Sequence, residues 1–210
     1  MLAALLPDAV STFEIREDPP GAELYPEEEA CVVRAVAGRR REFATGRYCA
    51  RVALRGLGLA PTAIAKGRRG APDWPQGVIG SITHCAGYRA AAVARASDLV
   101  GIGIDAEPNE PLPADVLDLV GRPPERHRLA GLAAAAPGVA WDRLLFSAKE
   151  SVYKAWAPLT GTFLDFDGAD ITFDPEMGTF RARILAGGAL PEMPGRFVVG
   201  GGLALTAVAW

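Results

Sequence analysis

The chain has 210 residues, of which half are hydrophobic and 22% are charged, and its formal net charge is −3. This composition is typical of an ordinary soluble globular protein, built as one domain or as two small lobes. The small negative charge gives no reason to expect a nucleic-acid partner, so any anion site must arise from a local cluster of basic residues.

The cysteines and the apolar stretches exclude further classes. Cys31, Cys49 and Cys85 form neither a disulfide framework nor a zinc motif, so we expect a cytoplasmic protein. The apolar residues 1–7 follow no basic region, so they do not predict a secretory signal. The longest apolar stretch, residues 197–210, is broken by three glycines. It is also shorter than the ~20 residues of a membrane helix, and we expect no membrane partner.

The first half is predicted to hold helices followed by strands. Pro26 and three glutamates suit a helix start. We expect a helix to about residue 37 and a second over 39–57, then a turn-rich connector over 61–77. Strands are expected over 78–82, 88–95 and 99–105, and because the turns are short we expect them to pair antiparallel.

The second half repeats this order. A proline-rich segment over 107–124 leads to a weak helix over 125–136. A clear amphipathic helix follows over 141–156, and Pro158 is expected to stop it. The remaining pattern predicts strands over 162–166, 169–173, 179–185, 196–199 and 203–209. We therefore expect an α+β fold of two similar lobes, residues 1–105 and 106–210, each with a helix on a small, mostly antiparallel sheet.

Two carboxylates end the apolar run before residue 107. In an extended strand Asp105 and Glu107 point the same way, and like charges so placed repel unless a cation lies between them. Hard oxygen ligands of this kind suit Mg²⁺, although two solvated acids at a strand exit would have the same pattern.

A third carboxylate and a cation lie on the predicted helix over 141–156. Glu150 and Lys154 are one turn apart and would ordinarily form a surface pair. However, Phe146 and Tyr153 flank the same side, so this helix face is more consistent with the wall of a cleft than with open solvent. The three acids and the cation together favour phosphate chemistry on a metal ion.

Basic residues cluster on the helix over 39–57. Arg47, Arg51 and Arg55 recur every four residues and form either a solvated face or a clamp for an anion. His84 lies where a strand turns, in the segment Gly80–Cys85, and would be either structural or a donor to a phosphate oxygen, with Ser81 beside it.

Four blocks of the sequence together resemble the 4′-phosphopantetheinyl transferases of the type that activates surfactin and enterobactin synthetases. The blocks are residues 39–51, 74–85, 103–107 and 146–155, in family order and at family-like spacing. The resemblance implies transfer of 4′-phosphopantetheine from coenzyme A to a serine of an acyl or peptidyl carrier protein, with release of adenosine 3′,5′-bisphosphate. It also implies a monomer that binds coenzyme A in a cleft between its two lobes.

The resemblance also assigns residues. Asp105, Glu107 and Glu150 would hold Mg²⁺, with Mn²⁺ as an alternative, and Glu150 would be the base for the carrier serine. The other residues that the resemblance assigns would contact the phosphates of coenzyme A. They are Arg39, Arg47, Lys66 or Arg69, Ser81, His84, Lys149 and Lys154. Asp105 would meet the pyrophosphate through the metal.

Three other interpretations stay open at this point. A magnesium-dependent phosphoesterase would explain the three acids but not the basic helix, the His84 block and Lys154 together. A coenzyme A or nucleotide-binding module without catalysis would gain nothing from three acids at the phosphates. An α+β domain whose charges all lie on the surface is the third.

Overall fold

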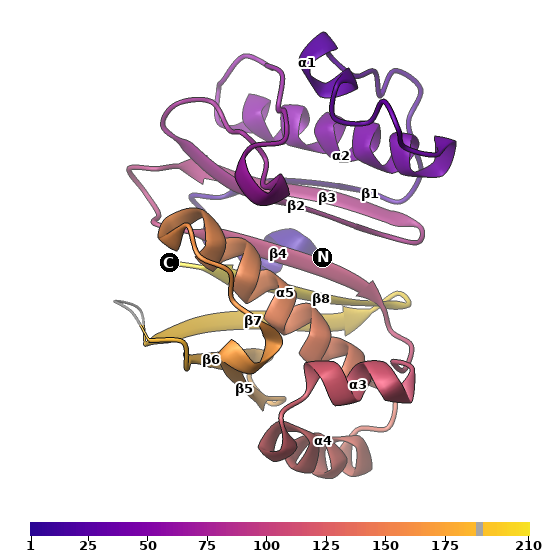
Figure 1. The fold of residues 1–210 in the computed structure, drawn as a ribbon, viewed down its shortest axis with the longest axis vertical. Helices are drawn as coiled ribbons and strands as arrows, with labels where there is room; N and C mark the ends of the chain where they lie inside the picture. The colour runs from indigo at the N-terminus through magenta and orange to yellow at the C-terminus, as the bar shows by residue number, and fades with distance from the viewer. Residues whose placement is uncertain (188–190) are drawn as a thin grey trace.

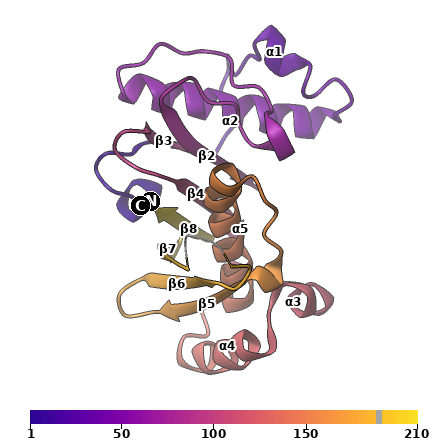
Figure 2. The same cartoon turned by 60° about the vertical axis from the view of Figure 1, so that its left-hand side comes forward.

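Two helix-on-sheet lobes make up the computed structural model, which describes residues 1–187 and 191–210 (Figure 1). The predicted α+β fold with two similar lobes is confirmed. In the views of Figures 1 and 2 the first lobe lies above the second, and each has one long helix against an antiparallel sheet.

The first lobe places α2 (Ala37–Gly56) on a sheet with the strand order β1-β3-β2. The strands are β1 (Ser11–Ile15), β2 (Val78–Cys85) and β3 (Tyr88–Arg95). Small residues on the inner face of α2, such as Ala50 and Ala53, are fully buried beside Ala91 and Val93 of β3. Close packing of small side chains brings the helix near the sheet.

The second lobe places α5 (Trp141–Thr160) on a five-stranded sheet with the order β4-β8-β7-β6-β5. The strands are β4 (Ile102–Pro108), β5 (Ala169–Asp174), β6 (Thr179–Ile184), β7 (Glu192–Gly200) and β8 (Leu203–Ala209). The apolar stripe of α5 is buried in this core, with Leu144, Leu145 and Val152 fully inaccessible to solvent. The sequence pattern therefore predicted this helix and its buried face correctly.

Shorter elements complete the fold. They are the helices α1 (Pro26–Glu29), α3 (Ala114–Val120) and α4 (Pro123–Ala135) and the 3₁₀ turns η1 (Leu2–Leu5), η2 (Arg68–Gly70) and η3 (Phe166–Gly168). Figure 1 shows α3 and α4 at the far end of the second lobe from α2.

The prediction that three consecutive strands pair in one sheet was wrong for the third. β4 pairs with β8 in the second sheet, not with β3. Its other edge faces β2, but side chains replace the ladder there: the Ile104 amide donates to Ser81 Oγ (3.1 Å), and the Ala106 amide donates to Thr83 Oγ1 (3.1 Å). Since these hydroxyls satisfy the buried amides, the two sheets meet without forming one continuous sheet.

Several predicted boundaries also differ. α1 ends at Glu29, well short of residue 37, and residues 162–166 are not a strand. Pro158 lies inside α5, which ends at Thr160 and is capped by Gly161 in the left-handed conformation (φ 64°). A proline this close to the helix end removes only one of the last hydrogen bonds, so the helix can continue past it. The sequence analysis missed β1 and α3.

A buried glutamate fixes the long helix of the first lobe. Glu28, the third residue of α1, is fully buried, and its carboxylate accepts hydrogen bonds from Arg51 of α2 at 2.8 and 2.9 Å. It also accepts from the amides of Ile64 (2.8 Å) and Tyr25 (2.9 Å). A buried carboxylate needs such a complete set of donors.

The second lobe repeats this arrangement. Glu125, the third residue of α4, is 1% exposed and pairs with Lys149 of α5 at 2.7 Å. Its carboxylate also accepts from the amides of Ile171 (2.7 Å) and Arg122 (2.8 Å). The duplication is therefore visible at the level of single interactions, although the sequence shows no residue-level repeat.

Candidate active site

Asp105 is at the centre of the candidate site, where β4 of the second lobe meets β2 of the first. It is 4% exposed, and its Oδ1 accepts hydrogen bonds from Lys154 Nζ (2.6 Å) and Thr83 Oγ1 (3.2 Å). Its Oδ2 is buried and has no hydrogen-bond partner within the described residues. An unpaired buried carboxylate oxygen is costly, so this atom fits a site that receives a cation.

Glu107 lies two residues further along β4 and is half-buried. Burial, followed by the repulsive charge of Asp105, raises its pKa to about 7. Arg143 of α5 opposes this shift, because its Nη1 donates to Glu107 Oε2 at 3.2 Å. The predicted like-charge pair of Asp105 and Glu107 is therefore present. Arg143 contacts Glu107, and Lys154 contacts Asp105.

Glu150 faces the same region from α5. Burial raises its pKa, Lys154 lowers it, and the Asp105 charge raises it further. Glu150 is thus near enough to Asp105 and Lys154 for their charges to act on it. Lys154 also donates to the backbone oxygen of Ile104 (3.2 Å), so its ammonium group bridges α5 and β4.

The three acids do not form a closed set of metal ligands. No group of three or more His, Cys, Asp or Glu side chains is arranged to hold a metal ion anywhere in residues 1–187 and 191–210. The unpartnered Oδ2 of Asp105 and the raised pKa of Glu107 nevertheless fit a cation at this place. The assignment of Asp105, Glu107 and Glu150 as metal ligands stays a prediction.

His84 and Arg39 meet at the first-lobe side of the site. The Arg39 Nη1 contacts His84 Nε2 and donates to Glu42 Oε2 at 3.3 Å. Burial lowers the pKa of His84, as do the charges of Arg39 and Lys154. The Lys154 effect indicates that cations from both lobes act on the same region, although they lie far apart in the sequence.

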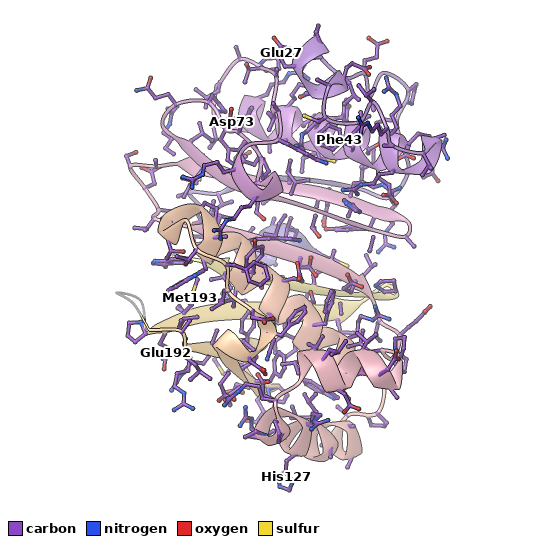
Figure 3. The ribbon with its side chains drawn as sticks, viewed as in Figure 1. Glu27, Phe43, Asp73, His127, Glu192 and Met193 are labelled. Atoms are coloured by element: carbon purple, nitrogen blue, oxygen red, sulfur yellow. The ribbon has the colours of Figure 1, made fainter. Side chains whose placement is uncertain are left out.

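Arg47 and Lys66 lie around Phe43, a residue of α2 labelled in Figure 3. The Arg47 guanidinium stacks 4.0 Å from the ring centroid of Phe43 and its Nε donates to the Ile64 oxygen at 2.6 Å. Burial lowers the pKa of Arg47 to about 10. Lys66 is exposed, with its Nζ 5.3 Å from the same ring. Lys66 is therefore the more accessible of the two cations.

Two predicted ligand contacts are used inside the protein. Ser81 is buried, and its hydroxyl accepts the Ile104 amide. Lys149 is 3% exposed, and its ammonium group is held by Glu125 and two backbone oxygens. These contacts support structural roles for both residues.

The basic face expected from Arg47, Arg51 and Arg55 is divided. Arg51 is buried in its pair with Glu28, while Arg55 is exposed near the end of α2. The prediction that these three residues form one basic face is therefore wrong, because Arg47 and Arg51 are buried. Arg69 is exposed in η2 with a positive φ of 56°, and its contact with a phosphate stays a prediction.

Sequence reasoning missed three residues that shape the site. Thr83 binds Asp105, and Arg143 binds Glu107. Gly103 lies where α5 crosses β4, and a Cβ there would come within 1.9 Å of the Ser151 oxygen. The glycine inside a strand was the available signal, because it marks a close approach of another backbone.

A hollow of about 1230 Å³ lies elsewhere, between the N-terminal segment and β5–β7, and none of the predicted site residues lines it. We place the site by its chemistry, because the charged side chains that line this hollow are all exposed, whereas Asp105 is buried and keeps a carboxylate oxygen without a partner in the described residues. The predicted ligand cleft between the lobes stays a prediction.

Comparison with known proteins identifies a family that covers both halves of the chain. Residues 27–94 match the model of the 4′-phosphopantetheinyl transferase N-terminal domain, and residues 101–191 match the 4′-phosphopantetheinyl transferase superfamily. The gap between the two matches falls between β3 and β4. Since β4 pairs with β8 and not with β3, we propose that the lobes divide there, before residue 105.

Curated relatives extend over the whole chain. The 4′-phosphopantetheinyl transferase Svp of Streptomyces mobaraensis is 57% identical over 218 residues, covering 100% of this chain and 89% of the relative. Npt of Nocardia iowensis is 46% identical, covering 100% of both chains, and PptT of Mycobacterium tuberculosis is 46% identical, covering 99% of this chain and 97% of the relative. The chain belongs to the 4′-phosphopantetheinyl transferase superfamily and is an enzyme of that class.

Proposed function

We propose that this enzyme moves the 4′-phosphopantetheine group of coenzyme A to a serine hydroxyl of an acyl or peptidyl carrier protein. The serine oxygen bonds to the β-phosphorus, the bond from that phosphorus to the leaving oxygen breaks, and adenosine 3′,5′-bisphosphate departs. The observation that carries the proposal is the meeting of Asp105, Glu107 and Glu150 with Lys154 where the lobes join.

Asp105, Glu107 and Glu150 are the residues that would hold Mg²⁺ or Mn²⁺. The unpartnered, buried Oδ2 of Asp105 supports this assignment, as do the hard oxygen donors of all three side chains. When bound, the metal ion supplies positive charge that offsets the charge on the coenzyme A pyrophosphate as the bond breaks.

Glu150 is the proposed base. A carboxylate whose pKa is raised by burial accepts a proton at neutral pH more readily than an ordinary glutamate. Glu150 takes the serine proton directly or through a water, while the Lys154 side chain lies beside the pyrophosphate.

The first lobe holds the nucleotide end. Arg39 and His84 are partly exposed at the junction and contact phosphate oxygens. Arg47 and one of Lys66 or Arg69 bind the 3′-phosphate or pyrophosphate. Lys66 is the more accessible of the two cations around Phe43.

We also propose that the enzyme acts as a cytoplasmic monomer without nucleic-acid or membrane partners. The net charge of −3 supports the absence of a nucleic-acid partner. Among the described residues, no helix combines the length and apolarity needed to cross a bilayer.

One incubation tests the function. The protein is mixed with coenzyme A, Mg²⁺ and an apo carrier protein, and the carrier is weighed by mass spectrometry. A gain of one phosphopantetheine is the expected result. An unchanged carrier with hydrolysed coenzyme A would support a phosphoesterase, and bound but intact coenzyme A would support a binding module. A panel of apo carriers then identifies the preferred partner.

A further inference from the structure

Lys149 is a buried lysine immediately before the proposed base Glu150. Its Nζ donates to three acceptors: Glu125 Oε2 (2.7 Å), the Phe166 oxygen (2.7 Å) and the Val120 oxygen (2.9 Å). A lysine ammonium group has three protons, so the three contacts use its full donor capacity. Lys149 therefore has no proton left for a substrate phosphate.

The three acceptors come from three different elements that pack beside α5. Val120 is the last residue of α3, Glu125 lies in the first turn of α4, and Phe166 begins η3. The other charges that act on Lys149 are Asp167 and Arg122, which have opposite signs. Lys149 thus attaches one edge of α5 to α3, α4 and η3.

The opposite edge of the buried face of α5 is fixed to the sheet. Ser147 Oγ lies 2.9 Å from Thr206 Oγ1 of β8, and the Thr206 hydroxyl also lies 2.9 Å from the Ser147 backbone oxygen. Nearby, the Gly103 backbone approaches the Ser151 oxygen too closely for any larger side chain. These contacts prevent the helix from sliding along β4.

Helix geometry places Glu150 between the two attachments. At about 100° per residue, Lys149 lies about 100° to one side of Glu150 and Ser147 about 60° to the other. Lys154 lies about 40° from Glu150 on the Ser147 side. A rotation of α5 about its axis would move Glu150 and Lys154 away from Asp105, and the Lys149 attachment opposes that rotation.

We infer that Lys149 is a positioning residue, which holds α5 at the rotation that directs Glu150 and Lys154 toward Asp105 and does not itself touch substrate. The inference depends on the proposed function, because it assumes that Glu150 and Lys154 act in the transfer. It assigns to Lys149 a role different from the phosphate contact that the sequence resemblance implies.

The test is Lys149→Met, alone and combined with Glu125→Gln. The single variant leaves the Glu125 carboxylate buried without its cation, so it loses stability, and the double variant removes that charge and regains part of the stability. We expect kcat to fall about 10- to 100-fold in both, because small misplacements of reacting groups cost about that much. The KM for coenzyme A, and its affinity measured by calorimetry without Mg²⁺, should stay within about twofold.

The matched control is the equivalent pair in the first lobe, Glu28→Gln with Arg51→Met. It removes a buried pair of the same kind from α2, which carries neither Glu150 nor Lys154. We expect a comparable loss of stability with kcat unchanged, and any loss of activity should be in the KM for coenzyme A.

Three outcomes overturn the inference. A raised KM for coenzyme A with kcat unchanged in the Lys149 variants would mean a phosphate contact. A normal kcat per folded molecule would mean a purely structural lysine. An equal fall of kcat in the first-lobe control would mean a general effect of destabilisation. Glu150→Gln and Lys154→Met test the proposed function separately: if both keep full activity, the active-site assignment fails, whatever Lys149 does.

Discussion

The two lobes share an architecture but differ in the chemistry that they bring to their junction. Each has a long helix on an antiparallel sheet, with a buried glutamate that pairs with a cation of that helix, Glu28 with Arg51 and Glu125 with Lys149. The first lobe then contributes cations such as Arg39, whereas the second contributes the three acids and Lys154. Under the proposed function the two copies of the scaffold divide binding and catalysis between them, because the residues that hold a helix in place are not those proposed for its functional face.

The largest expected effect tests whether the repeated pairs are energetically equivalent. Glu28→Ala and Glu125→Ala each leave a buried cation without its carboxylate, so each should lower the free energy of unfolding by about 3–5 kcal/mol. Chemical denaturation measures the loss. Arg181→Ala is the control, since its pair with Glu192 is exposed (70% and 49%) and should contribute less than ~1 kcal/mol. If either glutamate variant lost less than ~1 kcal/mol, as expected for the control, the two buried pairs would not be energetically equivalent.

Asp105→Asn tests the catalytic role proposed for the second lobe. It removes a charge at the proposed metal site but no core volume, so we expect kcat/KM to fall about 10²- to 10³-fold with the fold intact. Circular dichroism checks the fold, and the carrier mass assay checks activity. Full activity of this variant at limiting Mg²⁺ would refute the metal assignment.

The stability of the metal-free protein should depend on Glu107. Its folded pKa of about 7 lies above the unfolded value of 4.5, so the folded state binds more protons between these pH values. Stability contributed by the protonated acid is therefore present below about pH 4.5 and lost as the pH rises through about 7, by roughly 1–3 kcal/mol. Urea denaturation in a chelator at several pH values measures this loss. Glu107→Gln should flatten the profile, and an unchanged profile would contradict the shift.

The smallest expected effect concerns the binding of coenzyme A by the first lobe. Arg39 is 43% exposed, so Arg39→Gln should raise the KM for coenzyme A about tenfold without changing the melting temperature. Arg47→Gln is the contrasting variant, because Arg47 is buried against Phe43 and the Ile64 oxygen. It should lower stability by ~1–3 kcal/mol as well as weaken coenzyme A binding. A fall of kcat alone in Arg39→Gln would contradict the phosphate contact.

Local patterns in the sequence were sufficient for much of the fold. The apolar stripe of α5 and the apolar run of β8 depend on neighbours along the chain, so both elements were predicted with nearly correct bounds. β1 was missed because its five residues are only half-buried and show no clear alternation. The pairing of β4 was predicted wrongly because turn length favours the preceding strand, whereas β8 lies about a hundred residues further on.

The sequence by itself determined the class of chemistry, because acids at 105, 107 and 150 with Lys154 form a pattern that few functions need. Only the tertiary structure decided how the basic residues divide. Arg51 and Lys149 have the same charge as Arg39 and Lys154 in the sequence, but burial and long-range partners assign them to holding the helices in place. The physical reason is that a cation is available to a ligand only if the fold leaves its donors unused, and those partners lie too far along the chain for local spacing to indicate them.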